Sequence, residues 1–227
     1  MIGVDIGGTN LLVGTINNGK VIKRTHEEIK TSGNFELVAQ QVCDAIQNLS
    51  DDKIDSVGIS VAGSVDIENG IVLRAQNLDW DNAPLASYVS SKLQCKVVIE
   101  NDVTSAAWGE FNFGAGKENS SIFAVWVGTG IGGGLILNNS IWRGPLGTGG
   151  EFGMGISEAN PEAPARVLEA LASRSGYRDL LNNSTLHTDD LANGFGNDEE
   201  ITRVLTDGAT RIGTAIANAI TLLSLDT

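Results

Sequence analysis

The chain opens with MIGVDIGGTN, residues 1–10, and this stretch decides the fold. Its first half alternates the apolar residues Ile2, Val4 and Ile6, which predicts a buried strand. Its second half is a glycine turn, and such a turn taken alone is commonly a plain hairpin. The acidic residue Asp5, two positions before the glycines, favours a ligand-binding role for the turn. The turn then binds an anion, and the carboxylate holds Mg²⁺ directly or through water.

The donors of this first glycine turn suit a phosphate. Gly7 and Gly8 carry no Cβ, so their backbone N–H groups can approach an anion closely, and Thr9 and Asn10 add side-chain donors. The whole chain has 15 Lys+Arg against 28 Asp+Glu, a formal net charge of −13. Such a charge lacks the electrostatic footprint of a duplex-DNA binder or of a protein that binds anionic membranes. An anionic ligand is therefore expected to be held locally, by backbone N–H groups or a metal ion.

The segments that follow predict an α/β fold with a mixed sheet and a crossover helix. In the first half we expect strands over 11–17, 21–29, 56–61 and 96–100, hairpin turns at Asn18-Gly19 and Asn69-Gly70, and helices over 34–49, 84–93 and 104–111. In the second half we expect a strand over 122–127, a helix over 163–173, polar turns over 182–197 and a long amphipathic helix over 198–226.

A polar triplet, Glu100-Asn101-Asp102, follows the strand over 96–100. The carboxyl end of a strand is where α/β proteins place ligands. A carboxylate there can take a proton from an attacking hydroxyl, and the neighbouring Asn101 can orient that substrate. Asp102 has an alternative role as the N-cap of the next helix. Replacing a cap by alanine costs about 1 kcal/mol of stability, whereas replacing a base costs orders of magnitude in rate with the fold intact.

A second glycine motif, GTGIGGG over 128–134, follows an apolar strand. Five glycines in seven residues offer a nest of backbone N–H groups for phosphate oxygens. The motif is not a Walker loop, because no Gly-Lys-[Ser/Thr] follows, and not a dinucleotide fingerprint, because a strand is expected next. The candidate phosphate ligands are Gly128, Thr129, Gly130, Gly132 and Gly133. Two such loops imply a nucleotide held between two halves of the chain.

Six motifs in this order and spacing resemble the ROK family of sugar kinases and sugar-responsive repressors, members of the actin-like ATPase superfamily. They are DIGGTN, SVAGSVDIENG, NLDW, ENDVTSAAWGE, GTGIGGG and GGEFG. The resemblance covers almost the whole chain. It implies an actin-like ATPase (ribonuclease H-like) fold, with two domains over 1–103 and 104–227 around a central cleft. ATP and Mg²⁺ are expected on one side of that cleft and a hexose on the other.

The resemblance also implies roles for single residues. Asp102 becomes the catalytic base, and the residues expected to contact the sugar are Gly63, Asn77, Asn101, Asp102, Glu151 and Glu169. The implied reaction is ATP-dependent phosphorylation of a hexose, glucose or an N-acetylhexosamine, by in-line transfer. The alternative is a sugar-binding or regulatory relative that has lost the kinase activity.

Three departures from the family pattern shape further expectations. Met154 stands where the family has a zinc-ligating His, and 155–168 contains no Cys, so no zinc is expected. The repressors begin with a helix-turn-helix domain, whereas this chain opens on the first strand, so no nucleic acid partner is expected. Family members continue past the long helix into an adenosine-binding segment. We therefore expect this chain to bind sugar more readily than ATP and to associate as a homodimer through Leu222, Leu223 and Leu225.

The remaining residues of metal-binding type are isolated. Cys43 and Cys95 form no C-x-x-C pair, and His26 and His187 stand alone, so no zinc-type cluster can be written from them. Two buried thiols suit a reducing cytosol. The chain also has no apolar run of about 18 residues, and its first residues lack the basic region of a signal peptide. We therefore expect a cytoplasmic protein with no membrane partner.

Overall fold

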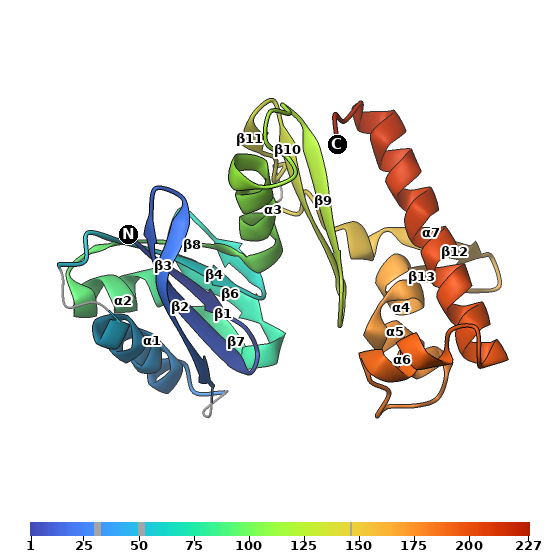
Figure 1. The fold of residues 1–227 in the computed structure, drawn as a ribbon, viewed down its shortest axis with the longest axis horizontal. Coiled ribbons are helices and arrows are strands. Elements are labelled where there is room, and N and C mark those ends of the chain that lie inside the picture. The colour runs from blue at the N-terminus through green and yellow to red at the C-terminus, as the bar shows by residue number, and fades with distance from the viewer. Residues whose placement is uncertain (30–32, 50–52, 146) are drawn as a thin grey trace. The chain divides into compact units, whose positions relative to one another are not determined.

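Two compact units form the structure (Figure 1). The computed structural model describes residues 1–29, 33–49, 53–145 and 147–227. Packing divides the chain into Met1–Ser105 and Ala106–Thr227. The separate binding roles expected for 1–103 and 104–227 stay a prediction, because packing alone does not show what either part binds.

A five-stranded sheet forms the centre of the first unit. Its strand order is β3-β2-β1-β4-β8, in which β1, β4 and β8 run parallel and β2 pairs antiparallel with both β1 and β3. The strands are β1 (Ile2–Ile6), β2 (Asn10–Asn17), β3 (Lys20–Glu28), β4 (Ser56–Val61) and β8 (Lys96–Asn101). The expected mixed α/β sheet is therefore confirmed.

Local sequence explains the first part of this sheet. Asn18 and Gly19 have φ of 48° and 72°, the left-handed geometry that a two-residue hairpin needs and that Asn and Gly adopt at low cost. Ile2, Val4 and Ile6 are buried, as the alternating pattern predicts. The sequence therefore places both the hairpin and the inward face of β1 correctly.

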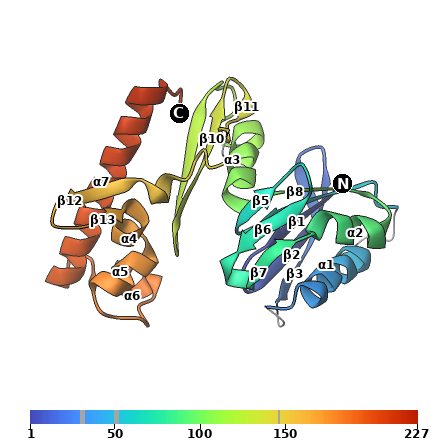
Figure 2. The ribbon, with the colours of Figure 1, turned by 180° about the vertical axis from the view of Figure 1, so that it is seen from behind.

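Two helices lie side by side on the sheet and complete its core (Figure 2). α1 (Phe35–Leu49) begins after Asn34, whose Oδ1 accepts a hydrogen bond from the Leu37 backbone N–H at 3.1 Å. The buried side of α1 consists of Val38, Ala39, Val42, Cys43, Ala45, Ile46 and Leu49. α2 (Leu85–Leu93) follows Pro84 and packs on α1 and β8. Both helices match the predicted ranges to within one residue.

A small antiparallel sheet, β5-β6-β7, belongs to the same unit. Its elements are β5 (Ser64–Asp66), β6 (Ile71–Ala75), the single turn η1 (Gln76–Leu78) and β7 (Trp80–Ala83). Gly70 turns the chain between β5 and β6 with φ of 69°. The predicted hairpin at Asn69-Gly70 is therefore confirmed.

The second unit begins with a helix and a three-stranded sheet. α3 (Asp102–Phe113) starts at the end of the first unit, and the sheet has the order β11-β10-β9. The strands are β9 (Ile122–Val127), β10 (Ile131–Leu137) and β11 (Ser140–Ile141). Ala107 of α3 packs with Ile122 and Ile136 in a small core. β10 begins inside the second glycine motif, so a strand rather than a helix follows that turn, as expected.

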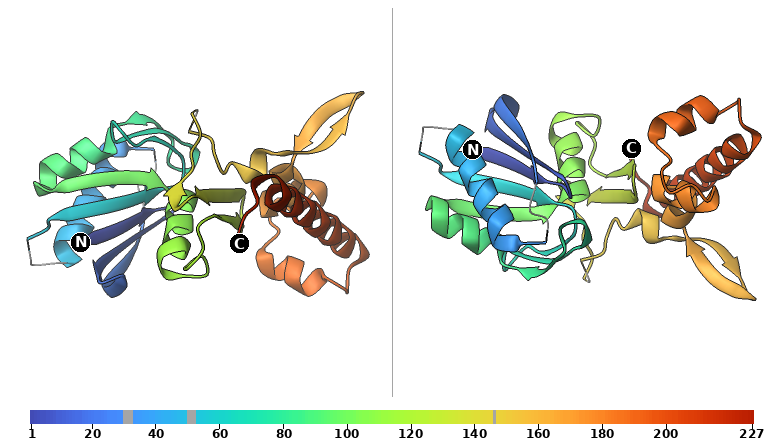
Figure 3. Two further views of the ribbon diagram at one scale, coloured as in Figure 1. Left: turned by 90° about the horizontal axis from the view of Figure 1, so that it is seen from above. Right: turned by 90° about the horizontal axis from the view of Figure 1, so that it is seen from below.

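The helix predicted over 163–173 is wrong in its first half. β12 (Ile156–Asn160) and β13 (Ala163–Val167) instead form a hairpin that projects from the helices of its unit (Figure 3), and α4 (Leu168–Ala172) follows. Pro164 disfavours helical geometry in Ala163, the residue before it, and pairing with β12 holds the rest of 163–167 extended. Val167 is also extended, with φ of −80° and ψ of 157°.

Two short helices follow in the second unit. α5 (Arg174–Leu180) begins after Ser173, whose hydroxyl accepts a hydrogen bond from Gly176 N–H at 3.0 Å. α6 (Thr188–Gly194) lies inside the segment 182–197, which the sequence predicts to be only turns. The Asp190 carboxylate accepts a hydrogen bond from the His187 backbone N–H at 2.7 Å. This cap stabilises a helix of seven residues that has little apolar periodicity of its own.

The long helix α7 (Glu199–Leu223) matches its prediction at the start and ends earlier than expected. Asp198 caps it by accepting from Ile201 N–H at 2.9 Å, and Ser224 ends it in the left-handed conformation with φ of 50°. The last residues then pair beside β9, where Phe123 N–H donates to the Thr227 carbonyl at 3.0 Å. Among the described residues, no helix is both long enough and apolar enough to cross a membrane.

Candidate active site

The carboxyl ends of three parallel strands meet at one edge of the first sheet. Gly7 follows β1, Ala62 and Gly63 follow β4, and Asn101 ends β8. Ala62 N–H donates to the Ile6 carbonyl at 3.3 Å, and the Asn101 side-chain amide donates to the Gly63 carbonyl at 3.0 Å. Adjacent parallel strand ends of this kind form the usual ligand edge of an α/β sheet.

Asn101 caps the helix that carries Asp102. The Asn101 Oδ1 accepts a hydrogen bond from Thr104 N–H at 2.9 Å, and α3 starts at Asp102. The alternative role of Asp102 as the N-cap is therefore wrong, because its neighbour fills that role. The Asp102 carboxylate is left at the start of the helix, where the Asn101 amide donates to its Oδ1 at 2.9 Å.

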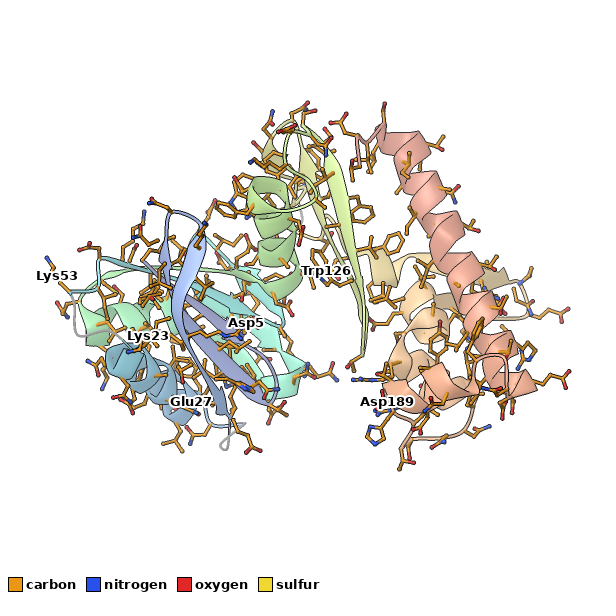
Figure 4. All side chains as sticks on the ribbon, viewed as in Figure 1. Asp5, Lys23, Glu27, Lys53, Trp126 and Asp189 are labelled. Carbon is orange, nitrogen blue, oxygen red and sulfur yellow. The ribbon has the colours of Figure 1, made fainter. Side chains whose placement is uncertain are left out.

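Two features of its surroundings raise the pKa of Asp102 above the usual aspartate value. Burial contributes most, and the negative charge of Asp5 adds to it, while hydrogen bonds from the Val103 backbone and the Asn101 side chain act in the opposite direction. Asp5 lies on β1 in the five-stranded sheet (Figure 4), and it accepts a hydrogen bond from the Ser60 hydroxyl at 2.7 Å. A carboxyl with a raised pKa is a better proton acceptor than an ordinary aspartate.

The first glycine turn is held by its own backbone and by a histidine. Gly7 N–H donates to the Asn10 carbonyl at 2.9 Å, and the Asn10 amide donates to the Thr9 hydroxyl at 3.1 Å. Asn10 Oδ1 lies 2.9 Å from His26 Nε2. Sequence reasoning treats His26 as isolated. The turn at Asn18-Gly19 is the signal that could have found this contact. Counting outward from that turn along both strands pairs the start of β2 with the end of β3.

Two glycines of the site have no room for a side chain. A Cβ on Gly63 would lie 2.2 Å from the Arg74 carbonyl oxygen, and a Cβ on Gly8 would lie 2.8 Å from the Asn77 Cβ. Asn77 itself is exposed beside the first glycine turn. The first unit therefore gathers two groups of predicted residues, Gly8 with Asn77 and Gly63 with Asn101.

The second glycine motif divides into an exposed turn and a strand. Gly128 and Thr129 are exposed and Gly130 is half-buried, and Gly128 N–H closes the turn on the Gly130 carbonyl at 2.8 Å. Gly132 and Gly133 lie within β10, and a Cβ on Gly133 would lie 2.7 Å from the Gly150 carbonyl and from the Phe123 ring. The exposed turn suits a phosphate, whereas the close packing gives Gly133 a structural reason to be glycine. A phosphate contact for Gly132 and Gly133 stays a prediction.

The two predicted sugar glutamates lie in the second unit and differ in their surroundings. Glu169 Oε2 accepts a hydrogen bond from Ile131 N–H at 2.7 Å, and a Cβ on Gly130 would lie 2.4 Å from that oxygen. Glu169 thus supports the base of the second glycine turn. Glu151 is exposed before the short turn η2 (Phe152–Met154). Sugar contacts for both residues stay predictions.

The residues around Met154, where no zinc is expected, are exposed or make other contacts. Met154 is 57% exposed, and Glu158 lies 3.4 Å from an Arg211 nitrogen in an ion pair. Across the part of the chain that the structure describes, no three His, Cys, Asp or Glu side chains converge as metal ligands. A magnesium ion needs fewer protein ligands, since it takes one or two carboxylates together with substrate phosphates. Asp5 beside Asp102 suits that smaller requirement, because a cation there offsets the repulsion between two carboxylates.

The sequence profile of the ROK family matches residues 1–227. The chain belongs to the ROK family. Among curated ROK relatives, glucokinase of Streptomyces coelicolor is 38% identical over 153 residues, covering 67% of this chain and 48% of that protein. Glucokinase of Thermotoga maritima is 36% identical over 188 residues, covering 80% of this chain and 59% of that protein.

Regulators belong to the same family. The xylose repressor of Caldicellulosiruptor bescii is 33% identical over 160 residues, covering 67% of this chain and 40% of the repressor. The chain therefore spans about half the length of the curated ROK proteins that it matches. These relatives establish the family of the chain. The family includes both kinases and regulators, so membership alone does not assign either activity to this chain.

A solved structure supports the fold. The ROK family glucokinase of Streptomyces griseus, determined in complex with glucose and AMPPNP, superimposes with a TM-score of 0.76 and 27% identity, covering 99% of this chain and 80% of that one. The structural neighbours include ROK kinases with the actin-like ATPase fold. The predicted fold class is therefore confirmed.

Proposed function

We propose that the chain phosphorylates a hexose, glucose or an N-acetylhexosamine, at the expense of ATP. The observation that carries this proposal is the carboxyl of Asp102. It lies half-buried at the ligand edge of the first sheet, has a raised pKa and is not needed as a helix cap. These properties fit a general base for a sugar hydroxyl.

The proposed reaction is an in-line phosphoryl transfer. Asp102 takes the proton of a sugar hydroxyl, with O6 as the first candidate, while the hydroxyl oxygen forms a bond to the γ-phosphorus. The bond between that phosphorus and the β–γ bridging oxygen breaks, and ADP leaves. Asn101 positions Asp102 through its 2.9 Å hydrogen bond. Asn101, Gly63 and Asn77 together supply amide and carbonyl groups for the other sugar hydroxyls.

The phosphate side of the proposal uses the two glycine turns. Gly7 to Asn10 offers backbone and side-chain donors in the first unit, and Gly128 to Gly130 offers an exposed turn in the second. Asp5 would hold Mg²⁺, which neutralises charge on the transferring phosphoryl oxygens when bound. In a chain of net charge −13, such local donors are needed to offset the charge of a polyphosphate.

A second candidate function is regulation by sugar binding without phosphoryl transfer. The observation that favours it is the similarity to the xylose repressor at 33% identity. The two candidates share a sugar site and differ in the use of Asp102. A regulator needs no proton acceptor, so the pKa of that carboxyl has no function in it.

One experiment separates the two candidates. Hexose-dependent ADP release is measured over a panel of sugars, and calorimetry measures sugar binding to the same preparation. ADP release that Asp102→Asn abolishes, with sugar affinity within roughly tenfold of the parent, supports the kinase. Sugar binding with no ADP release above the Asp102→Asn background supports the regulator, and absence of sugar binding overturns both.

Asp44→Asn is the matched control for that substitution. Asp44 lies on α1, is exposed and accepts a hydrogen bond from the Gln40 side chain at 2.8 Å, an interaction that an amide oxygen can keep. The same charge is removed within the same unit. Asp44→Asn should therefore leave both ADP release and sugar binding unchanged.

A further inference from the structure

The second glycine turn is bound tightly to the start of α5. Arg174 N–H donates to the Gly128 carbonyl at 2.9 Å, and Ser175 N–H donates to the Thr129 carbonyl at 3.1 Å. The carbonyls of Gly128 and Thr129 are thus directed to the helix. Within the described part of the chain, the amides of Thr129 and Gly130 have no hydrogen-bond acceptor. They are the donors that this turn has left for a ligand.

The side chain of Arg174 reaches the same turn. Its Nη2 donates to the Thr129 hydroxyl, and its Nη1 donates to the Thr188 hydroxyl at 3.2 Å. Both partners are neutral. In the described residues no carboxylate lies within ion-pair distance of this guanidinium, and its buried Nε has no partner. Arg174 is therefore a cation without a counter-charge among the residues that the structure describes, and it is held against a glycine turn.

The backbone around Arg174 is closely fixed. Ser173 is fully buried, its N–H donates to the Glu169 carbonyl at 3.1 Å, and its hydroxyl caps α5. A Cβ on Gly176 would lie 2.7 Å from the Glu169 carbonyl oxygen, so α4 and α5 approach each other closely. The guanidinium thus extends from a rigid corner, and fixed donors lose less entropy when a ligand binds.

We propose that Arg174 binds the phosphate chain of the nucleotide at the turn Gly128–Gly130. A guanidinium presents paired N–H donors that match two phosphate oxygens, and Thr129 already holds it beside the unused amides. The inference deepens the proposed kinase function and rests on it. The ligand class is a linear polyphosphate, and the adenine and the sugar are not required for this contact.

The test measures binding of inorganic tripolyphosphate and of ATP by calorimetry, without sugar. Arg174→Gln should weaken both by roughly tenfold to hundredfold, the range expected for charge-assisted hydrogen bonds, and should leave glucose binding unchanged. Arg174→Lys keeps the charge without the paired donors, so its affinity for both ligands should lie between that of the wild type and that of Arg174→Gln. The wild-type affinity should decrease with salt more steeply than that of Arg174→Gln.

Arg178→Gln is the matched control, because Arg178 lies one turn further along α5 and donates through Nε to the Leu186 carbonyl at 2.8 Å. It should leave tripolyphosphate binding unchanged. Equal binding by wild type and Arg174→Gln, or no binding by wild type, overturns the inference. If Arg174→Gln does not fold, Arg174→Lys decides by the same measurement. Arg174-dependent binding without hexose-dependent ADP release would instead retain the phosphate site and refute the kinase.

Discussion

Asn101 makes three contacts with one side chain, and they position the residue beside it. Its oxygen caps α3 through Thr104, and its amide nitrogen donates to both Gly63 and Asp102. The sequence indicates that a polar triplet ends this strand. The sequence could not tell which of Asn101 and Asp102 caps the helix, because that depends on which side-chain oxygen faces the first turn of the helix.

The pKa of Asp102 should respond to the charge of Asp5. The charge of Asp5 contributes to its raised value, and burial contributes more. Asp5→Asn removes the charge and leaves the burial, so the pKa of Asp102 should fall and still remain above the usual aspartate value. Carboxyl-carbon NMR titration without Mg²⁺ measures it. An unchanged pKa would mean that the two carboxylates do not interact, and Asp44→Asn is the control.

Gly63 and Gly58 form a matched pair for a second prediction. A Cβ on Gly63 would lie 2.2 Å from the Arg74 carbonyl oxygen, whereas a Cβ on Gly58 in β4 would have nothing within 4 Å. Gly63→Ala should lower the free energy of unfolding by about 1–3 kcal/mol through overpacking. Gly58→Ala should raise it by about 0.5–1 kcal/mol, because alanine loses less backbone entropy in a strand. Urea unfolding measures both, and equal effects would contradict the crowding at Gly63.

The helices and strands of the two units differ in how well the sequence predicts them. β4 and α1 have strong periodic patterns, and their boundaries are predicted to within one residue. The short helices α4 and α6 have five and seven residues, and helices of that length are stable only through tertiary packing. The sequence of α6 therefore contains too little local signal to predict a helix, and for α4 the predicted helix extends too far toward the N-terminus because the pairing of β13 with β12 is not visible in the local pattern.

The segment after α7 is attached to the residues before β9 through Asp226. Asp226 accepts hydrogen bonds from the backbone N–H groups of Ser120 and Ser121 and from the Ser120 hydroxyl, and these bonds lower its pKa below the usual 3.8. A lowered folded-state pKa stabilises the folded chain above the ordinary pKa. That contribution is lost as the pH falls through the folded-state value.

Asp226→Asn should therefore loosen the tail at neutral pH and remove its response to acid. Hydrogen exchange at Phe123, whose N–H donates to the Thr227 carbonyl at 3.0 Å, should become faster in the variant. Asp207→Asn, which changes an exposed carboxylate on α7 paired with Arg211, is the control. If Phe123 exchanges at the same rate in both variants, the Asp226 contacts do not hold the tail.

The last turn of α7 exposes several large apolar side chains. Leu222 is 82% exposed, Leu223 is 40% exposed and Ile220 is 47% exposed. Leu225 is only partly exposed, and association through Leu222, Leu223 and Leu225 stays a prediction. Exposed apolar side chains clustered in this way favour association.

We therefore predict that the chain self-associates and that Leu222→Glu shifts it toward monomer in sedimentation equilibrium. Leu37→Glu is the matched control, because Leu37 is a helical leucine in the first unit with 52% exposure. Loss of association in both variants would indicate a general effect of added charge. Persistent association in Leu222→Glu would place the contact elsewhere.

The positions of the buried thiols have a consequence for watching this protein unfold. Cys43 and Cys95 are both buried in Met1–Ser105, and burial raises the pKa of the Cys43 thiol to about 11. A protonated, covered thiol reacts with a labelling reagent only after its surroundings open. Three of the four tryptophans, Trp108, Trp126 and Trp142, lie in Ala106–Thr227. Thiol labelling therefore reports the opening of the first unit, and tryptophan fluorescence reports mainly the unfolding of the second. Urea transitions that do not coincide for the two probes would show that the units unfold independently.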